Sequence, residues 1–277
     1  VLVQVPASAA ATALAVGGSH ACALLAGGAV KCWGTNAFGQ LGDGSQTARL
    51  GAVDVVGLDS GVVAISAGYY YSCAITSAGR LKCWGENTSG QLGDGSNTHR
   101  STPTDVVGLS SGVQAVASGD QHTCAIVAGG AVKCWGFNFF GLVLGDQSAV
   151  DRNVPGDVPA LSGGVVELAL GAYASCVRLQ DGSVRCWGVN PIGDNTELAR
   201  PTPTEVAGLE ESVTDVDIGE IARELLDELM NLGWTYPGWQ IDDHVPHMDD
   251  DTPWGHRGRA QATGYICGLL AAVAKLG

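Results

Sequence analysis

Residues 22–34 read CALLAGGAVKCWG, and this stretch decides the fold because the chain repeats it three more times. The other copies begin at Cys73, Cys124 and Cys176, so successive copies start 51, 51 and 52 residues apart. A repeat of that length, built from short apolar runs, is typical of arrays of similar structural units. We therefore treat the chain as such an array.

Each copy predicts a β-hairpin, because two apolar runs flank a short break that contains glycine. If the two cysteines of a copy lie opposite each other, a three-residue loop remains, and its last position is glycine in every copy. Such loops need a left-handed residue at that position, and glycine adopts this conformation without strain. The four glycines are Gly28, Gly79, Gly130 and Gly182.

The paired cysteines then fall on a non-hydrogen-bonded position of the ladder, where the short Cα separation suits a disulfide. Free buried thiols are the alternative. A zinc site fits less well, because zinc-binding cysteines usually stand about two to four residues apart. Four disulfides would indicate an oxidising compartment. The predicted bonds are Cys22–Cys32, Cys73–Cys83, Cys124–Cys134 and Cys176–Cys186.

The composition suits a turn-rich all-β protein. The chain has 277 residues, of which 41 are glycines and 15% are charged. A further 45% are hydrophobic, which is enough to fill a core. The formal net charge of −14 argues against nucleic-acid binding, which depends on lysine and arginine. No apolar run approaches the roughly 18 residues of a membrane span. We therefore expect neither a nucleic-acid partner nor a membrane helix.

Each unit is expected to contain four short strands: one that ends in glycine, two in the cysteine hairpin, and one led by a proline such as Pro103. Four strands in about 50 residues are typical of a propeller blade. The expected fold is therefore an all-β, β-propeller-type repeat array over residues 1–219. Its units span about 11–61, 62–112, 113–164 and 165–212, with part of a fifth at 213–219.

Residues 220–277 depart from the repeat and predict a short α-helical C-terminal appendage. Apolar residues at three- and four-residue spacing in 221–232, and an Ala- and Leu-rich run in 259–276, predict two helices. Because the end of a repeat array needs covering, we expect Ile221, Leu225 and Leu229 to face the last blade.

The units resemble repeats of the regulator-of-chromosome-condensation family, through G-x-x-H-x-C-A followed by V-K-C-W-G-x-N-x-x-G-Q-L-G-D-G-S. The resemblance implies a seven-bladed β-propeller, and the cysteine pairs are similar to those of a bacterial, secreted branch. Seven units of this period need about 360 residues, more than the chain has. The third and fourth loops, GLVLGDQS and PIGDNT, depart from the family pattern.

An Asp- and His-rich loop between the two predicted helices contains the candidate metal ligands. Its IDDHVPH segment is weakly similar to a C-terminal segment of zinc aminopeptidases and glutaminyl cyclases. That resemblance implies a metal-dependent hydrolase, but the other ligands of those enzymes come from an α/β domain that this sequence lacks. We therefore prefer a solvated acidic loop, with no cofactor and no catalytic residue. The candidates are Asp242, Asp243, His244 and His256.

Several repeated residues are best explained by structure. His20 and His122 are expected to pack in the core, because Tyr71 and Ala174 occupy the same place in the other units. One loop aspartate per unit suits turn chemistry better than calcium, which needs about six to eight oxygen ligands. The tryptophans are expected to pack one blade on the next. They are Trp33, Trp84, Trp135 and Trp187.

The units differ most in the loop after their first strand and in the loop after the Trp-Gly pair. Both loops follow an odd-numbered strand of the blade, so both should emerge on one face. Aromatic residues in loops on a rigid scaffold are typical of binding surfaces, although ordinary surface variation explains them as well. The candidate partner-binding residues are Phe38, Tyr69, Tyr70, Asp120, Gln121, Phe139, Phe140 and Tyr173.

The sequence therefore predicts a non-catalytic propeller, extracellular, on the cell surface or periplasmic, that captures a protein partner on its aromatic loops. Some secreted proteins that it resembles inhibit enzymes through one propeller face. Two alternatives remain: a metal-dependent hydrolase centred on the C-terminal Asp/His segment, and a nucleotide-exchange or chromatin-type regulator like the eukaryotic family members.

Overall fold

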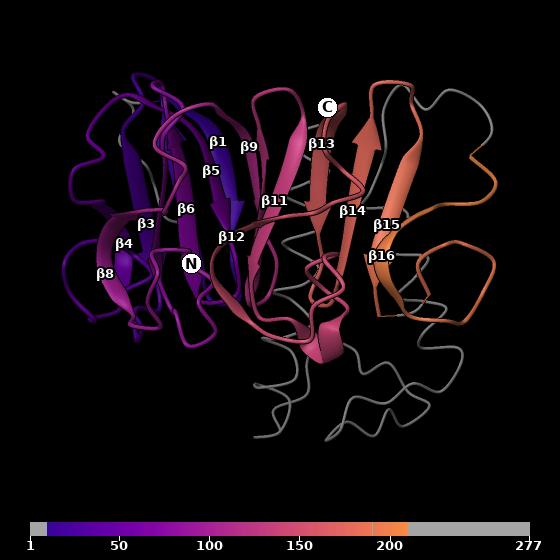
Figure 1. Cartoon of the computed structure of the whole chain (residues 1–277). Helices are drawn as coiled ribbons and strands as arrows, with labels where there is room; N and C mark the ends of the chain where they lie inside the picture. Colours follow the sequence, from indigo (N-terminus) through magenta and orange to yellow (C-terminus); the bar gives the residue numbers. More distant parts are fainter. Residues whose placement is uncertain (1–9, 190, 210–277) are drawn as a thin grey trace, which may run out of the picture.

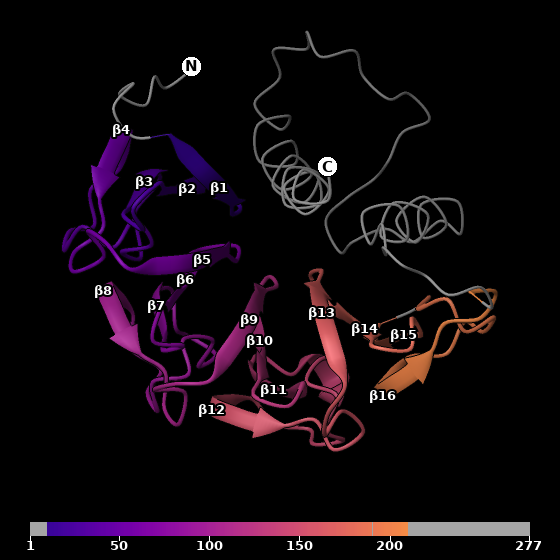
Figure 2. The same cartoon turned by 90° about the horizontal axis from the view of Figure 1, so that it is seen from above.

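The computed structural model describes residues 10–189 and 191–209, and this part of the chain is all-β. Its strands form four antiparallel sheets of four strands each (Figure 1). Seen from above, the sheets lie along an arc like the blades of a propeller, with their first strands toward the centre (Figure 2). The predicted helical appendage and the partial fifth unit lie outside the described residues.

Within every blade the strands follow chain order from the centre outward. The first blade contains β1 (Ala11–Val16), β2 (His20–Leu25), β3 (Val30–Gly34) and β4 (Arg49–Asp54). The second contains β5 (Val62–Ala67), β6 (Tyr71–Thr76), β7 (Leu81–Gly85) and β8 (Arg100–Asp105). The third contains β9 (Val113–Ser118), β10 (His122–Val127), β11 (Ala131–Gly136) and β12 (Arg152–Asp157). The fourth contains β13 (Val165–Leu170), β14 (Ala174–Leu179), β15 (Val184–Gly188) and β16 (Arg200–Glu205).

The cysteine hairpins confirm the predicted register and the predicted disulfides. In each hairpin the two cysteines lie directly opposite each other, with Cα atoms 4.1 Å apart and the disulfide formed. Each bond closes an 11-residue loop, which contributes about 2–3 kcal/mol to stability by restricting the unfolded chain. The last loop residues have the predicted positive φ, at Gly28 (+82°), Gly79 (+73°), Gly130 (+76°) and Gly182 (+86°).

The outer strands begin earlier than the sequence predicted. β8 starts at Arg100, three residues before Pro103, the proline expected to lead it. Gly85 pairs with Arg100 and Cys83 with Thr104, so Pro103 falls where the ladder is irregular. A proline is tolerated there because it has no N–H to contribute to the ladder.

The core lies between the blades. We call the side of a blade that faces the next blade its trailing side, and the opposite side its leading side. In the first junction, Leu24 and Val30 of the trailing side pack with Ile65 and Trp84 of the following leading side. Equivalent clusters fill the second and third junctions, so each blade completes the core of its predecessor.

The tryptophans confirm their predicted place in three of the four blades. Trp84, Trp135 and Trp187 are fully buried. Their indole Nε1 atoms donate to the carbonyl oxygens of Gln40 (2.9 Å), Gln91 (3.0 Å) and Val143 (2.8 Å) in the preceding blade. Trp33 is only half-buried, because no blade precedes β1 within the described residues. Leu14, on the same leading side, is 51% exposed for the same reason.

Candidate functional site

The two variable loops of each blade are joined by a backbone hydrogen bond, so they emerge on the same face. We call the loop after the first strand the inner loop, the loop after the third strand the outer loop, and their common surface the loop face. In each blade the residue after the Trp-Gly pair donates its N–H to an inner-loop carbonyl. The pairs are Thr35 with Ser19, Glu86 with Tyr70, Phe137 with Gln121, and Val189 with Tyr173, all at 2.8–2.9 Å.

Each fully described outer loop is built around one buried asparagine that the sequence reasoning missed. Asn87 accepts a hydrogen bond from the N–H of Leu92 (2.9 Å) and donates to the carbonyl oxygens of Ser96 (2.9 Å) and Thr98 (3.1 Å). Asn36 and Asn138 occupy the same place and make the same kinds of bonds. The signal was available, because W-G-x-N recurs in all four units.

The outer loops are closed by an aspartate that binds the first residue of the outer strand. Asp43 accepts bonds from the N–H (2.9 Å) and the hydroxyl (2.7 Å) of Ser45, which confirms its predicted turn role, and it pairs with Arg49 at 2.7 Å. Burial alone would raise the pKa of Asp43, but the bonds from Ser45 and Arg49 outweigh it and hold that pKa below its ordinary value. The drifting third and fourth loops keep the ion pair, as Asp146–Arg152 and Asp194–Arg200.

The first aromatic cluster on the loop face, cluster A, joins the first and second blades. Phe38 of the first outer loop contacts Tyr70 of the second inner loop, with ring centroids 5.2 Å apart. Tyr70 also contacts Tyr69 at 4.4 Å, and Phe38 contacts His99 at 5.0 Å. The sequence reasoning named three of these four residues and missed His99, which stands where the other units have Ala or Asp.

The second aromatic cluster, cluster B, joins the third and fourth blades. Phe139 is its centre, with ring centroids 4.4 Å from Phe140, 4.8 Å from Tyr173 and 5.8 Å from Phe137. Phe139 and Phe140 form the short 3₁₀ turn η1 (Phe139–Gly141), which marks the loop face at the lower edge of Figure 1. Phe137 was missed because single aromatic residues after Trp-Gly do not recur in the other units.

Phe140 combines exposure with an unfavourable backbone conformation. Its side chain is 83% exposed, and its φ of +49° lies in the left-handed region that bulky residues rarely adopt. The third outer loop is one residue longer between its Trp and its Arg than the first two. The additional residue follows the turn, because the Gly141 N–H bonds to the Asn138 carbonyl oxygen as that of Gly39 does to Asn36. The loop therefore holds a large apolar ring in solvent at a conformational cost.

The two polar candidates lie between the aromatic clusters, in the inner loop of the third blade. The carbonyl oxygen of Asp120 accepts from the N–H of Tyr69 at 3.3 Å, and that of Gln121 accepts from the N–H of Phe137. The structure thus places all eight predicted residues on the loop face. It brings the aromatic ones into two separate clusters, with Asp120 and Gln121 connected to them through the backbone.

A hydrogen-bonded relay fixes the blades to one another at the inner end of these loops. His20 Nε2 lies 2.8 Å from the hydroxyl of Ser72, which donates to the carbonyl oxygen of Gln40. His122 Nε2 meets the hydroxyl of Ser175 at 3.0 Å in the same way. Because the hydroxyl donates to a carbonyl, it accepts from Nε2–H. The two histidines are therefore packing residues, as predicted.

The buried histidines predict a pH dependence of stability. Burial lowers the pKa of His20 to about 4 and that of His122 to about 3, below the ordinary 6.5. Below pH 6.5 the unfolded chain binds protons that the native state does not, so stability is lost as the pH falls. We expect each histidine to lower the free energy of unfolding by about 1.4 kcal/mol for each pH unit between pH 6.5 and about 4.

The measurement is the urea unfolding midpoint at pH 7 and at pH 5, above the range in which aspartates titrate. The matched variant is His122→Ala, because Ala174 stands at this position in the fourth blade. It should lower stability at pH 7 and remove about half of the loss on acidification. If His122→Ala loses as much stability between pH 7 and pH 5 as the original protein, His122 does not cause the pH dependence.

The candidate metal ligands Asp242, Asp243, His244 and His256 lie outside the described residues. Within residues 10–189 and 191–209, no three His, Cys, Asp or Glu side chains group as metal ligands. In that same part of the chain, no helix has the length and hydrophobicity of a membrane-spanning segment.

A propeller of Trp-Gly blades with clustered loops on one face defines a class of repeat protein, and sequence comparison gives the family. Two sequence models described as "Regulator of chromosome condensation (RCC1) repeat" match the chain, and together they cover more than half of it. The chain belongs to the RCC1 repeat family. One model matches residues 28–75 and 78–126, and the other matches 11–40, 62–91, 113–142 and 165–191.

Two human relatives are ubiquitin ligases much longer than this chain. The E3 ubiquitin-protein ligase HERC2 is 33% identical over 250 residues, which are 84% of this chain and 5% of HERC2. The probable E3 ubiquitin-protein ligase HERC4 is 32% identical over 169 residues, 58% of this chain and 16% of HERC4. The chain therefore corresponds to a small part of either relative.

Two solved structures show the same fold. Human WBSCR16 matches with a TM-score of 0.65 and 22% identity, over 74% of this chain and 55% of that one. Yeast RCC1 (Prp20), solved with Kap60 bound, matches with a TM-score of 0.61 and 23% identity, over 73% of this chain and 50% of that one.

Proposed function

We propose that the protein is a non-catalytic RCC1-type propeller that binds a protein partner through its loop face. The observation that carries the proposal is Phe140. An exposed ring held at a φ of +49° costs about 1–3 kcal/mol, and glycine or asparagine would adopt this conformation at lower cost. Strained, exposed aromatic residues on a rigid support are typical of binding sites.

The surroundings of Phe140 support this interpretation. Phe139 packs against it and is itself packed against Tyr173, so the ring is presented on a support and not on a free loop. Large aromatics dominate binding hot spots because they bury much area with little loss of rotamer freedom. Cluster A, with Phe38 and Tyr70, supplies a second apolar contact on the same face.

The four disulfides suggest an oxidising environment. We propose that the protein works outside the cytosol, in the extracellular space, on the cell surface or in the periplasm. A chromatin-type role is the second candidate, because a related fold, yeast Prp20p, is described with its binding to Gsp1p and histones. The disulfides favour the first candidate over the second.

The test is site-specific photocrosslinking under oxidising conditions. A photoreactive phenylalanine analogue is placed at position 140, or as the matched control at position 181, an exposed hairpin loop on the opposite face. Each protein is incubated with the secreted and periplasmic fractions of the source cells. A partner protein crosslinked from position 140 and not from position 181 supports the proposal. Crosslinking to nucleic acid, or equal crosslinking from both positions, contradicts it.

A further inference from the structure

The trailing side of the fourth blade differs from the other three at two core positions. In the first three blades a small residue on the first strand pairs with a large apolar residue on the second, and both face the next blade. These cross-strand pairs are Ala13 with Leu24, Ala64 with Ile75, and Ala115 with Ile126. In the fourth blade the corresponding pair is Glu167 with Arg178.

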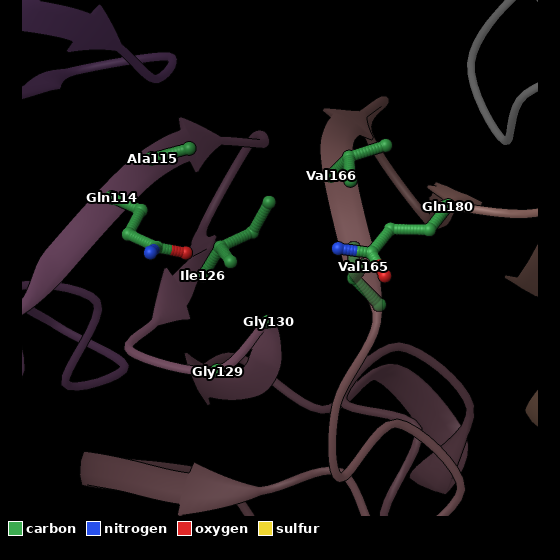
Figure 3. A pocket seen from close by; sticks show the side chains of 8 residues that line it. All are labelled: Gln114, Ala115, Ile126, Gly129, Gly130, Val165, Val166 and Gln180. Atoms are coloured by element: carbon green, nitrogen blue, oxygen red, sulfur yellow. The ribbon is translucent and has the colours of Figure 1, made fainter.

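Glu167 and Arg178 form an ion pair on this side. Arg178 Nε donates to Glu167 Oε2 at 3.0 Å, and the Arg178 and Glu167 side chains are 22% and 24% exposed. At the third junction the same positions, Ala115 and Ile126, instead face Val165 and Val166 of the next blade across a groove of about 400 Å³ (Figure 3). A complete blade stacked on Glu167 and Arg178 would bury an ion pair in an apolar junction, which is costly.

The rest of the fourth trailing side, as far as the structure describes it, is apolar and includes Leu209. Val184 and Ile192 are buried, and Val206 and Leu209 pack against them. Leu209 corresponds to Leu58, Leu109 and Leu161, which are buried in the three junctions. This side therefore needs a cover that leaves the ion pair partly exposed.

The sequence pattern of the repeat continues past Leu209. In the first three junctions, the first strand of the following blade begins four residues after the junction leucine. It begins with a buried valine, at Val62, Val113 and Val165. Four residues after Leu209 stands Val213, in VTDVDIG, which matches the first strands up to their final glycine. After this glycine the sequence departs from the repeat, because Glu224 stands where the next cysteine should be.

We propose that the trailing side of the fourth blade is the docking surface for residues 213–219 of the same chain, bound as a single first strand without a blade behind it. Val213 and Val216 take the places of Val62 and Ile65, over the aliphatic stem of Arg178. The guanidinium group stays paired with Glu167 and open to water, because no further strands cover it.

The experiment measures thiol protection in the 277-residue chain. Its ninth cysteine, Cys267, lies outside the four disulfides and is changed to serine, so that the engineered cysteine is the one free thiol. Glu167→Cys reports on the docking surface. The matched control is Ala64→Cys, the same register position in the second blade, where the third blade provides the cover. We expect both engineered thiols to react with a thiol reagent far more slowly than in urea. Adding Val213→Asp should speed labelling at position 167 at least tenfold and leave labelling at position 64 unchanged.

Three outcomes would overturn the proposal. The thiol at position 167 could react at the rate of the unfolded chain, or Val213→Asp could leave it protected. Protection could also disappear on dilution, which would identify a second copy of the chain as the cover. If Val213→Asp exposes the thiol at position 64 as well, the milder Val213→Ala decides, and equal acceleration at both positions would then contradict a local docking surface.

Discussion

Replacing Phe140 by asparagine and Tyr70 by alanine is expected to weaken partner binding about a hundredfold while leaving the propeller as stable as before. Each aromatic anchor of a hot spot contributes about 1.4 kcal/mol or more, and 1.4 kcal/mol is a factor of ten in affinity. Asparagine tolerates the left-handed conformation that Phe140 adopts at φ +49°, so this substitution relieves strain. Tyr70 lies in a surface cluster, outside the hydrophobic clusters that fill the first and second junctions.

The measurement is the Kd of the partner identified by crosslinking, together with the thermal midpoint of each variant. The matched control changes two residues of the opposite face, Ala78→Ser and Asp181→Asn, in the hairpin loops. Affinity should fall in the first double variant and stay the same in the control. Normal binding by Phe140→Asn/Tyr70→Ala, with loss of binding in the control, would assign the partner to the other face.

Replacing Trp135 by alanine is expected to lower the free energy of unfolding by about 4 kcal/mol, as is typical for a fully buried aromatic residue. The substitution removes a ring from the second junction and the indole bond to the Gln91 carbonyl oxygen. The matched variant is Trp33→Ala, at the same position in the first blade. Because Trp33 is half-buried, we expect Trp33→Ala to lower the free energy of unfolding by less than half as much as Trp135→Ala.

Urea unfolding of both variants gives the comparison, with the disulfides intact. A loss at Trp33 as large as at Trp135 would mean that the leading side of the first blade is covered as completely as the internal junctions. A small loss at Trp135 would contradict the assignment of the core to the junctions.

Most of the fold could be predicted because the same strand and turn patterns occur in four copies of the repeat. One hairpin with Gly28 in its loop is ambiguous, but four hairpins with glycine at the same place fix the register and with it the disulfides. The strand led by Pro103 was placed three residues late, because proline usually begins a strand and the sequence gives no sign of an irregular ladder.

The loop face could be predicted only in outline. Strand order alone places the inner and outer loops together, which is why Tyr70 and Phe38 were named. The contacts of His99 and Phe137 depend on how two loops from different strands pack, and no periodic pattern encodes this. An alignment of the four units shows that Glu167 and Arg178 replace the small and large apolar residues of the other blades. Only the structure shows that these positions face the next blade.

The carbonyl group that accepts the indole N–H has a consequence for how such proteins diversify. The Val143 carbonyl belongs to the third outer loop, but the groups that hold it, Trp187 and the Ser175 hydroxyl, belong to the next blade. A recognition loop is therefore supported by the neighbour that follows it. Grafting the Phe139–Phe140 turn onto another RCC1 array would require transplanting β14 and β15 as well, so the exchangeable module of this architecture is the junction and not the single blade.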